Sequence, residues 1–538
     1  MTKIKASEKF ILLLKEYGMK SVFGIPGAPF SKYLEFIKKH KVDNVLTANE
    51  TGAAIMADVT ARLTGTPGVC YATYGPGATN LATGIGGAYL DNSPVIALTS
   101  EFDSKYSNRN IQMMINHQKL FQPITKWTTS ANTKNINGTI HKAYSIALSE
   151  KPGPVHIGLS NEFSNAQCQE KIVRDKLNIA TSIIEKDSDN FNDVIKLLKK
   201  SNNPLIVLGN TARRIVQKNI LHKLAEKFNA PVIITPMSKG VFDENHNLFV
   251  GVFYHALSSN LDSIFKNTDL VIAIGYDTVE YNYESWLPKN IPIVNINTSN
   301  CDIEKNYTKV INITSNINDT LLLLSKEKYK SVWDNFLIDN VKKQISDCLL
   351  PAKNHFGPVE AFNIIKENSD DNTILTVDVG AHTHLAGQFW KPKFNDSFIM
   401  TNGWSSMGFS VPAGIAAKYV FPNRKVISVS GDGGFTMTAG EVITARRLNL
   451  NVIFIVLCDK SLSLIRIKQS RNNIKKVGVD LYNNTLFCAD TFLGLPVFQA
   501  NNSKQMNDAI KKCSNLKTSS IIEVNVDTND YDKILSCK

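Results

Sequence analysis

The stretch from Val426 to Gln469 decides the fold, and it reads VISVSGDGGFTMTAGEVITARRLNLNVIFIVLCDKSLSLIRIKQ. Apolar, β-branched residues predict one strand over Val426–Val429 and a second strand over Val452–Leu457. Between them lie a glycine-rich turn, Gly431–Gly434, and a segment with helical spacing, roughly Ala439–Leu448. A strand, a turn, a helix and a second strand make one βαβ unit, so this stretch predicts a parallel sheet.

An acidic residue follows each of the two strands. Asp432 follows the first strand and Asp459 follows the second, 27 positions later. Open α/β sheets bind ligands at the carboxyl ends of their strands, and paired carboxylates beside glycines suit Mg²⁺ bound through a phosphate. Gly433 and Gly434 allow backbone N–H groups to approach that phosphate. A plain Gly-Asp-Gly turn is the alternative, and the second acidic residue argues against it.

Length and charge set bounds on the protein. The chain has 538 residues, which predicts three or four domains, and its hydrophobic content of 43% is ordinary for a globular protein. The formal net charge is +12, but the lysines are scattered and form no basic block. We therefore expect a solvated basic surface that attracts small anions, and no nucleic-acid partner.

Cysteine usage and hydropathy predict the compartment. Eight cysteines lie far apart without a CxxC pair, which indicates free thiols in a reducing environment. The N-terminal segment reads as an amphipathic helix, not a signal peptide, and no apolar run reaches the roughly 18 residues that a membrane span needs. We expect a cytoplasmic protein with no membrane partner.

Alternating strand and helix signals divide the chain into three α/β domains of the doubly wound, parallel-sheet type. The expected domains are residues 1–165, 190–340 and 358–538, joined by polar connectors. The central domain contains no Walker motif and no GxGxxG turn, so it shows no nucleotide site of its own.

Several stretches resemble the thiamine diphosphate enzymes. The run ANETGAAIMADVTARLTGTPGVCYATYGPGATNLATGI, Ala48 to Ile85, resembles their pyrimidine-binding domain, and the Asp432–Asp459 spacing resembles their metal–diphosphate motif. The segment AIGYDTVEYNYESW, Ala273 to Trp286, is similar to the catabolic, flavin-independent acetolactate synthases. The resemblance covers nearly the whole chain and implies the fold of that family.

The resemblance implies a thiamine diphosphate and Mg²⁺ site. Glu50 would bind the aminopyrimidine ring and promote removal of the thiazolium proton, although a carboxylate at a strand end is more often solvated or salt-bridged. Met407, otherwise a core residue, would be the wedge that bends the cofactor. The metal ligands would be Asp432, Asp459 and the Ser461 carbonyl. The implied cofactor-binding residues are Pro26, Gly27, Glu50, Gly75, His382, Ser405, Met407, Gly431, Asp432, Gly433, Gly434, Asp459, Ser461 and Leu462.

The implied reaction is decarboxylation of a 2-oxo acid, most simply pyruvate, followed by carboligation to a second carbonyl. Gln118 is a candidate catalytic residue and substrate contact, and the resemblance adds Ala28, Leu464 and Lys468 as substrate contacts. The family builds its sites between subunits, so we expect a homodimer or a homotetramer. Flavin is not expected, although some relatives bind it in the equivalent domain.

The sequence departs from the family near the second substrate. Asn49 and Thr51 stand where His and Gln are usual, and Lys468 stands where the catabolic branch has Gln. These departures leave open a carboligase with an acceptor other than pyruvate, and a non-catalytic paralogue. A simple decarboxylase is a further alternative, but such enzymes often carry two adjacent histidines where this chain has only His117.

Overall fold

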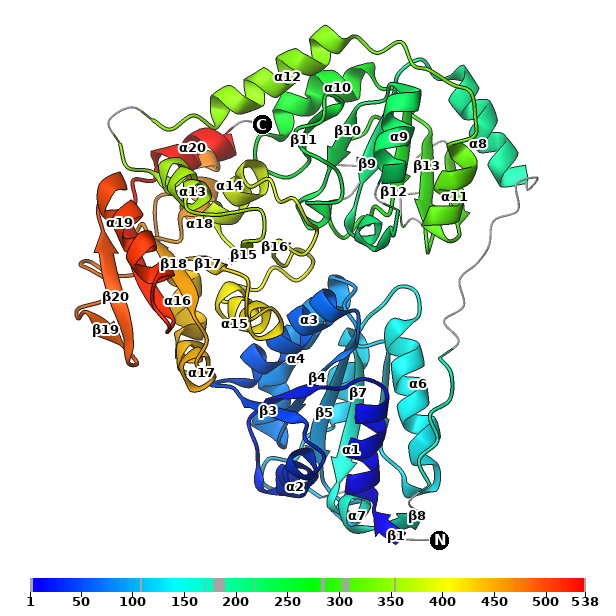
Figure 1. The fold of residues 1–538 in the computed structure, drawn as a ribbon, viewed down its shortest axis with the longest axis vertical. Coiled ribbons are helices and arrows are strands. Elements are labelled where there is room, and N and C mark those ends of the chain that lie inside the picture. The colour runs from blue at the N-terminus through cyan, green and yellow to red at the C-terminus, as the bar shows by residue number, and fades with distance from the viewer. Residues whose placement is uncertain are drawn as a thin grey trace.

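Three parallel β-sheets follow one another along the chain in the computed structural model (Figure 1). The structure describes residues 3–106, 109–169, 171–177, 189–217, 219–281, 286–300, 302, 309–352 and 355–536. The first sheet is drawn in blue and cyan, the central sheet in green, and the third in yellow to red. The predicted fold class, three doubly wound parallel-sheet domains, is confirmed.

The first sheet has the strand order β3-β2-β4-β5-β7-β6, and all its strands are parallel. Its strands are β2 (Ser21–Gly24), β3 (Asp43–Leu46), β4 (Gly68–Ala72), β5 (Val95–Glu101), β6 (Trp127–Ser130) and β7 (Val155–Ser160). Its helices are α1 (Ala6–Glu16), α2 (Ser31–Lys39), α3 (Glu50–Thr64), α4 (Gly75–Leu90), α5 (His117–Phe121), α6 (Ile136–Leu148) and α7 (Asn161–Asn165). A small antiparallel pair, β1 (Lys3–Lys5) with β8 (Gln167–Gln169), joins the two ends of this part.

Helices cover both faces of the first sheet, as the alternation of side chains along its strands requires. On β4, Cys70 packs in the core formed with α3 and α4, whereas its neighbour Tyr71 packs in the core formed with α1, α2 and α6. Both faces are therefore apolar, which is typical of a parallel sheet.

The central sheet has the order β11-β10-β9-β12-β13-β14 and is also entirely parallel. Its strands are β9 (Pro204–Leu208), β10 (Val232–Ile234), β11 (Phe249–Val252), β12 (Leu270–Ile274), β13 (Ile293–Asn297) and β14 (Val310–Thr314). Its helices are α8 (Asp189–Lys200), α9 (Asn219–Phe228), α10 (Asp262–Asn267), α11 (Ile317–Leu324) and α12 (Asn335–Cys348). Of the Ala273–Trp286 motif, residues 282–285 lie outside the described residues.

The third sheet has the order β16-β15-β17-β18-β21-β20-β19, and only β19 is antiparallel to its neighbour. Its strands are β15 (Ile374–Val377), β16 (Phe398–Ile399), β17 (Val426–Gly431), β18 (Val452–Cys458), β19 (Thr491–Phe492), β20 (Leu495–Ala500) and β21 (Ser520–Asn525). Its helices are α13 (Pro358–Glu367), α14 (Ala381–Phe389), α15 (Ser410–Val420), α16 (Asp432–Thr438), α17 (Val442–Arg447), α18 (Ser463–Arg471), α19 (Ser503–Ser514) and α20 (Asn529–Ser536). Because β17 and β18 are direct neighbours, the two predicted acidic residues share one edge.

A helix was expected over roughly Ala439–Leu448, and helical residues occupy this range, but a further helix before it was not predicted. Helix α16 begins at Asp432 itself, and a 3₁₀ turn (Ala439–Glu441) separates it from α17. The Asp432 carboxylate accepts the Gly433 N–H at 2.8 Å, and a negative charge is favourable in the first turn of a helix. Glycines that look like a turn in the sequence therefore lie in the first turn of α16.

The first and third sheets share one hydrophobic core. Helix α3 packs against α15, and both present alanines such as Ala54 and Ala413 to the shared core. At its edge, the Asp91 carboxylate accepts hydrogen bonds from Arg62 Nη2 (2.9 Å), Thr401 Oγ1 (2.6 Å) and the Gly403 N–H (2.8 Å). Asp91 therefore fixes the segment that leads to Ser405 and Met407 onto the first sheet.

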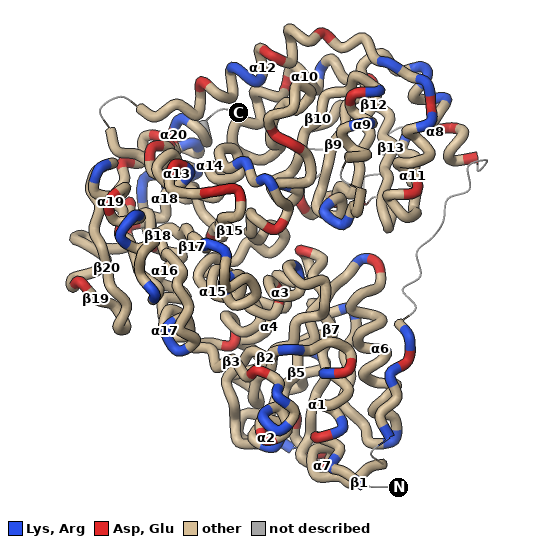
Figure 2. Tube along the Cα trace, in the orientation of Figure 1, with Lys and Arg blue, Asp and Glu red and all other residues tan. Residues whose placement is uncertain are grey.

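Charged positions of both signs are interspersed along all three parts of the chain (Figure 2). Within the described ranges, none of the helices combines the length and the apolar character that crossing a membrane demands.

Replacing Asp91 by Ala removes one of the two carboxylates that pair with Arg62, the other being Asp58, and it leaves the Thr401 hydroxyl and the Gly403 N–H without this acceptor. We expect the free energy of unfolding to fall by about 3 kcal/mol, because the buried groups that remain lose a charged partner. The measurement is the midpoint of urea unfolding. As a control, Asp371→Ala breaks an exposed ion pair with Lys393 and should leave the midpoint nearly unchanged. Equal midpoints for the two variants would contradict this role of Asp91.

Candidate active site

A cavity of about 200 Å³ lies at the carboxyl ends of β15, β17 and β18. Many of the predicted cofactor residues line it together, although they come from four separate segments of the third part of the chain. The predicted residues in its wall are His382, Ser405, Met407, Gly431, Asp432, Gly433, Gly434, Asp459, Ser461, Leu462 and Leu464. The sequence did not predict Tyr531, which also lines it.

Two carboxylates meet in this cavity. Asp432 is buried and Asp459 is partly buried. Burial raises the pKa of Asp432, and burial together with the nearby charge of Asp432 raises the pKa of Asp459 to about 6. Both shifts reflect poorly solvated carboxylates, and the shift of Asp459 also reflects the charge of Asp432, which is the electrostatic setting that a divalent cation relieves.

Polar atoms without protein partners complete the wall. The Nε2 atom of His382 and the hydroxyl of Ser461 are buried, and neither makes a hydrogen bond within the part of the chain that the structure describes. Burial lowers the pKa of His382 to about 4, so its imidazole is neutral and can offer one N–H. Paired carboxylates, a glycine-rich helix start and unpartnered donors fit a diphosphate held through a divalent cation.

Asp378 positions the loop that carries Met407, and the sequence analysis missed this role. Its buried carboxylate accepts the Gly408 N–H at 2.9 Å and the Phe409 N–H at 3.3 Å. Burial raises the pKa of Asp378 to about 6. The thioether methyl of Met407 lies against Gly433, where an added Cβ would come within 3.3 Å of it. Met407 therefore projects over the glycine turn, as the wedge prediction requires.

Glu50 lies in a second group of residues, at the strand ends of the first sheet. It is buried, it is the first residue of α3, and its Oε2 accepts a hydrogen bond from Asn80 Nδ2 at 3.1 Å. A Cβ at Gly77 would lie 3.1 Å from Glu50 Oε1, so the glycine leaves room for the carboxylate. Gly75 has a φ of +30°, and a side chain there would meet the Met113 carbonyl.

Pro26, Gly27 and Ala28 follow β2 at the same edge, where Gly27 is packed against the side chain of Thr73. These three residues, Glu50 and Gly75 do not line the cavity of the third sheet. The predicted cofactor residues thus form two groups within one chain. Lys468 stands apart from both, exposed on α18 and outside the cavity wall.

The two departures beside Glu50 have local structural roles. Asn49 caps α3, because its side-chain oxygen accepts the Thr51 N–H at 2.8 Å. The Thr51 hydroxyl donates to the Asn80 carbonyl at 2.6 Å, and Asn80 in turn holds Glu50. Both residues therefore help to fix the start of the helix that bears the glutamate.

Glu441 anchors the same helix from the third part of the chain, and sequence reasoning missed it. It is 1% exposed, and its carboxylate accepts the N–H groups of Ala48 (3.0 Å) and Asn49 (2.9 Å) and the hydroxyl of Thr444 (2.9 Å). Burial raises its pKa. A Cβ at Gly52 would overlap this carboxylate. The segment just before Glu50 is thus bound to the segment that follows the Gly431–Gly434 turn.

Gln118 lies in a hydrogen-bonded network instead of the cavity. Its Nε2 donates to Glu101 Oε1 at 2.6 Å, and its Oε1 accepts the hydroxyl of Thr128 at 2.6 Å. Its Nε2 is engaged, so the side chain could contact a substrate without losing a bond only through the second lone pair of Oε1.

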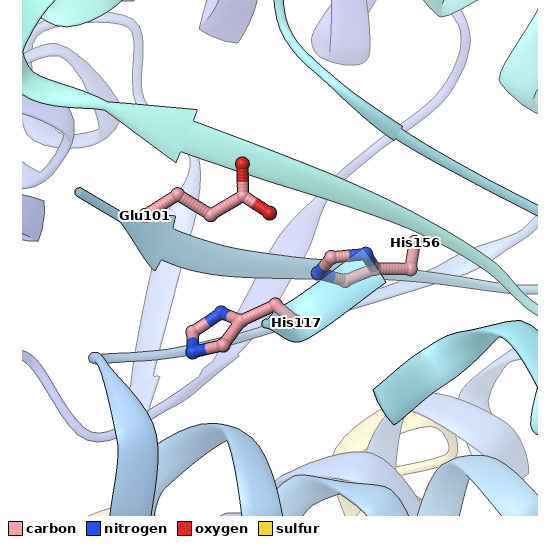
Figure 3. Close-up of side chains that lie close together, drawn as sticks. All are labelled: Glu101, His117 and His156. Atoms are coloured by element: carbon pink, nitrogen blue, oxygen red, sulfur yellow. The ribbon is translucent and has the colours of Figure 1, made fainter. Parts of the chain in front are cut away.

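Glu101, His117 and His156 come close together in this network, with one possible ligand atom from each within 4.8 Å of the others (Figure 3). Hydroxyl groups already occupy these atoms. The Thr99 Oγ1 lies 2.8 Å from His117 Nδ1 and 2.7 Å from His156 Nε2. The Ser130 hydroxyl donates to Glu101 Oε2 at 2.6 Å. These hydrogen bonds are those of a polar network within the protein, and they account for the close approach of the three side chains.

Changing Glu441 to Gln replaces one acceptor oxygen by an NH₂ group that faces backbone N–H donors. We expect the free energy of unfolding to fall by about 1–3 kcal/mol, the usual effect of leaving buried donors unsatisfied, and the melting temperature to fall with it. Glu226→Gln is the matched control, because the Glu226 side chain is exposed and pairs with His246 at the surface. An unchanged melting temperature for Glu441→Gln would show that the anchor contributes nothing.

Comparisons with known proteins agree with this geometry. Three family models match in order: the N-terminal TPP binding domain of thiamine pyrophosphate enzymes (residues 4–121), their central domain (191–324) and their C-terminal TPP binding domain (378–524). Thiamine pyrophosphate is another name for thiamine diphosphate.

Full-length relatives point the same way. A probable acetolactate synthase large subunit of Methanocaldococcus jannaschii is 31% identical over 86% of this chain and 81% of its own length. The acetolactate synthase of Bacillus subtilis is 26% identical over 100% of this chain and 96% of its own. A catabolic acetolactate synthase of Raoultella terrigena is 25% identical over 96% and 94%. The chain belongs to the thiamine diphosphate-dependent acetolactate synthase family.

Proposed function

We propose that this protein decarboxylates pyruvate and joins the remaining two-carbon unit to a second pyruvate, giving 2-acetolactate, with thiamine diphosphate and Mg²⁺ and without flavin. One observation carries the proposal. The cavity at the strand ends of the third sheet combines paired carboxylates, a glycine-rich helix start and an apolar Met407. A diphosphate, a cation and an aromatic ring need these three elements.

Each group of residues has a defined task in this reaction. Thiamine diphosphate supplies the electron sink that accepts electrons as CO₂ leaves. Asp432, Asp459 and the Ser461 carbonyl would hold the cation, while the Gly434 N–H and the His382 imidazole would bind the diphosphate. Glu50 would hold a proton at a pyrimidine ring nitrogen, and its burial beside Asn80 keeps water from competing for that proton.

The separation of the two groups supports assembly from two copies. Glu50, Gly27 and Gly75 do not line the cavity that Asp432 and Asp459 share. We therefore propose that each complete site takes its Glu50 group from one subunit and its cavity from another, in a homodimer or homotetramer. Ala28, Gln118, Leu464 and Lys468 remain the candidate substrate contacts.

Two further features of the proposal concern organisation and compartment. The family matches and the three sheets support domains at residues 1–165, 190–340 and 358–538. The six cysteines that the structure describes are all free thiols, which supports a reducing compartment such as the cytoplasm.

The decisive experiment supplies the purified protein with thiamine diphosphate, Mg²⁺ and pyruvate, without added flavin. We expect CO₂ release, and acetoin after acidification, because acid decarboxylates acetolactate to acetoin. CO₂ with acetaldehyde as the main product would identify a simple decarboxylase. Turnover only with a different acceptor added would identify another carboligase, and a cofactor-bound protein inert towards a panel of 2-oxo acids would favour a non-catalytic role.

Replacing Glu50 by Gln tests the proton-holding role. We expect the turnover rate to fall by at least about 100-fold, in the range that general acid–base groups contribute, while binding of thiamine diphosphate persists. Turnover is followed by CO₂ release, and binding by quenching of intrinsic fluorescence. Glu35→Gln, on the exposed face of α2, is the control. Full activity in Glu50→Gln would refute the assignment.

A further inference from the structure

A tyrosine outside the predicted site contacts one of the predicted metal ligands. The hydroxyl of Tyr482 donates a hydrogen bond to Asp432 Oδ2 at 2.9 Å. The same oxygen accepts the Lys460 N–H at 2.8 Å, while Asp432 Oδ1 accepts the Gly433 N–H at 2.8 Å. Tyr482 is partly buried and does not belong to the cavity wall, so it contacts the predicted site from outside, through the Asp432 carboxylate.

Backbone hydrogen bonds put Tyr482 in this position. After α18 the chain turns back, and the residues from Val479 to Leu481 run along the loop that follows β18. The Leu462 N–H donates to the Val479 carbonyl at 2.8 Å, and the Leu481 N–H donates to the Lys460 carbonyl at 3.0 Å. An antiparallel bridge between Ser461 and Asp480 lies between these bonds. These backbone hydrogen bonds fix the segment that leads to Tyr482 beside the loop that carries Asp459 and Ser461.

The start of the returning segment is anchored as well. The Gln469 side chain donates from Nε2 to the Val477 carbonyl at 2.9 Å and accepts the Val477 N–H at 3.3 Å. An ion pair joins Lys476 to Asp480. With contacts at both of its ends, the segment holds its terminal tyrosine in one place.

The hydrogen bonds of Asp432 divide its two oxygens into different roles. Each carboxylate oxygen offers about two lone pairs. Two donors, Tyr482 and the Lys460 N–H, occupy Oδ2, whereas a single N–H occupies Oδ1. Oδ2 is therefore the more heavily hydrogen-bonded oxygen, and Oδ1 is the one more accessible to a cation.

We propose that Tyr482 is a positioning residue of the metal site, which blocks Oδ2 of Asp432 and so restricts this ligand to one-oxygen binding through Oδ1. The inference rests on the proposed Mg²⁺ site. Mg²⁺ demands near-octahedral geometry with separate ligand atoms, whereas Ca²⁺ accepts two oxygens of one carboxylate in a looser shell. Tyr482 therefore favours Mg²⁺ over Ca²⁺.

The test is Tyr482→Phe, which keeps the ring and removes only the hydroxyl. Mg²⁺ and Ca²⁺ are titrated separately into the full-length protein with saturating thiamine diphosphate, and binding is measured by calorimetry. We expect the Kd for Mg²⁺ to rise about tenfold, the usual effect of removing a hydrogen bond that orients a ligand. The Kd for Ca²⁺ should stay within about twofold, because the freed Oδ2 compensates for the lost orientation.

Tyr419→Phe is the matched control. The Tyr419 hydroxyl donates to the carboxylate of Asp43 at 2.6 Å, and neither residue lines the cavity. It removes the same kind of bond and should change neither Kd. Equal weakening of both ions in Tyr482→Phe would show a merely structural role and overturn the inference, as would unchanged binding of both. A wild-type protein that binds neither ion with thiamine diphosphate would refute the proposed metal site itself, and the inference with it.

Discussion

The structure depends on placing two negative charges at the ends of neighbouring strands. Strands β17 and β18 pair in parallel register up to Gly431 and Leu457, so the acidic residues that follow them are forced to one edge of the sheet. Burial and the nearby charge of Asp432 raise the pKa of Asp459 to about 6, so the pair is poorly solvated. Backbone N–H groups of Gly433, Lys460 and Ser461 donate hydrogen bonds to the two carboxylates and so stabilise their negative charge.

Buried carboxylates also hold the loops around the site. Asp91, Asp378 and Glu441 are buried carboxylates, and each accepts backbone N–H groups from a segment distant in sequence. A carboxylate can accept several such bonds at once, whereas an apolar contact sets no direction. These three residues therefore orient the loops before Ser405, after Met407 and before Glu50, and they tie the site to the shared core of the first and third sheets.

Sequence patterns predicted what depends on local chemistry. The β-branched runs predicted β17 and β18, and the Gly-Asp-Gly turn with its second aspartate predicted that Asp432 and Asp459 lie together, whereas Met407 came from the family resemblance. The family resemblance supplied Glu50. The start of α16 was missed because glycines score as turn formers, and the favourable charge of Asp432 at a helix start is a smaller signal.

Asp378, Glu441 and Tyr482 escaped prediction for a different reason. Their partners lie 30, 393 and 50 positions away, and most of these partners are backbone N–H groups, which every residue type except proline provides. For Gln118 the sequence suggested a role but not its surroundings. Its position beside His117 did not reveal that its amide is hydrogen-bonded to Glu101 and Thr128.

The packing of Gly52 against Glu441 has a consequence for how this sequence can change over time. Any side chain at position 52 would occupy the space of the Glu441 carboxylate, and loss of that carboxylate would strand the N–H groups of Ala48 and Asn49. Neither position can drift independently of the other. Among descendants of this protein, a substitution at one should persist only in the company of a compensating substitution at its partner, so the two sites form a single evolutionary unit spread over two sheets.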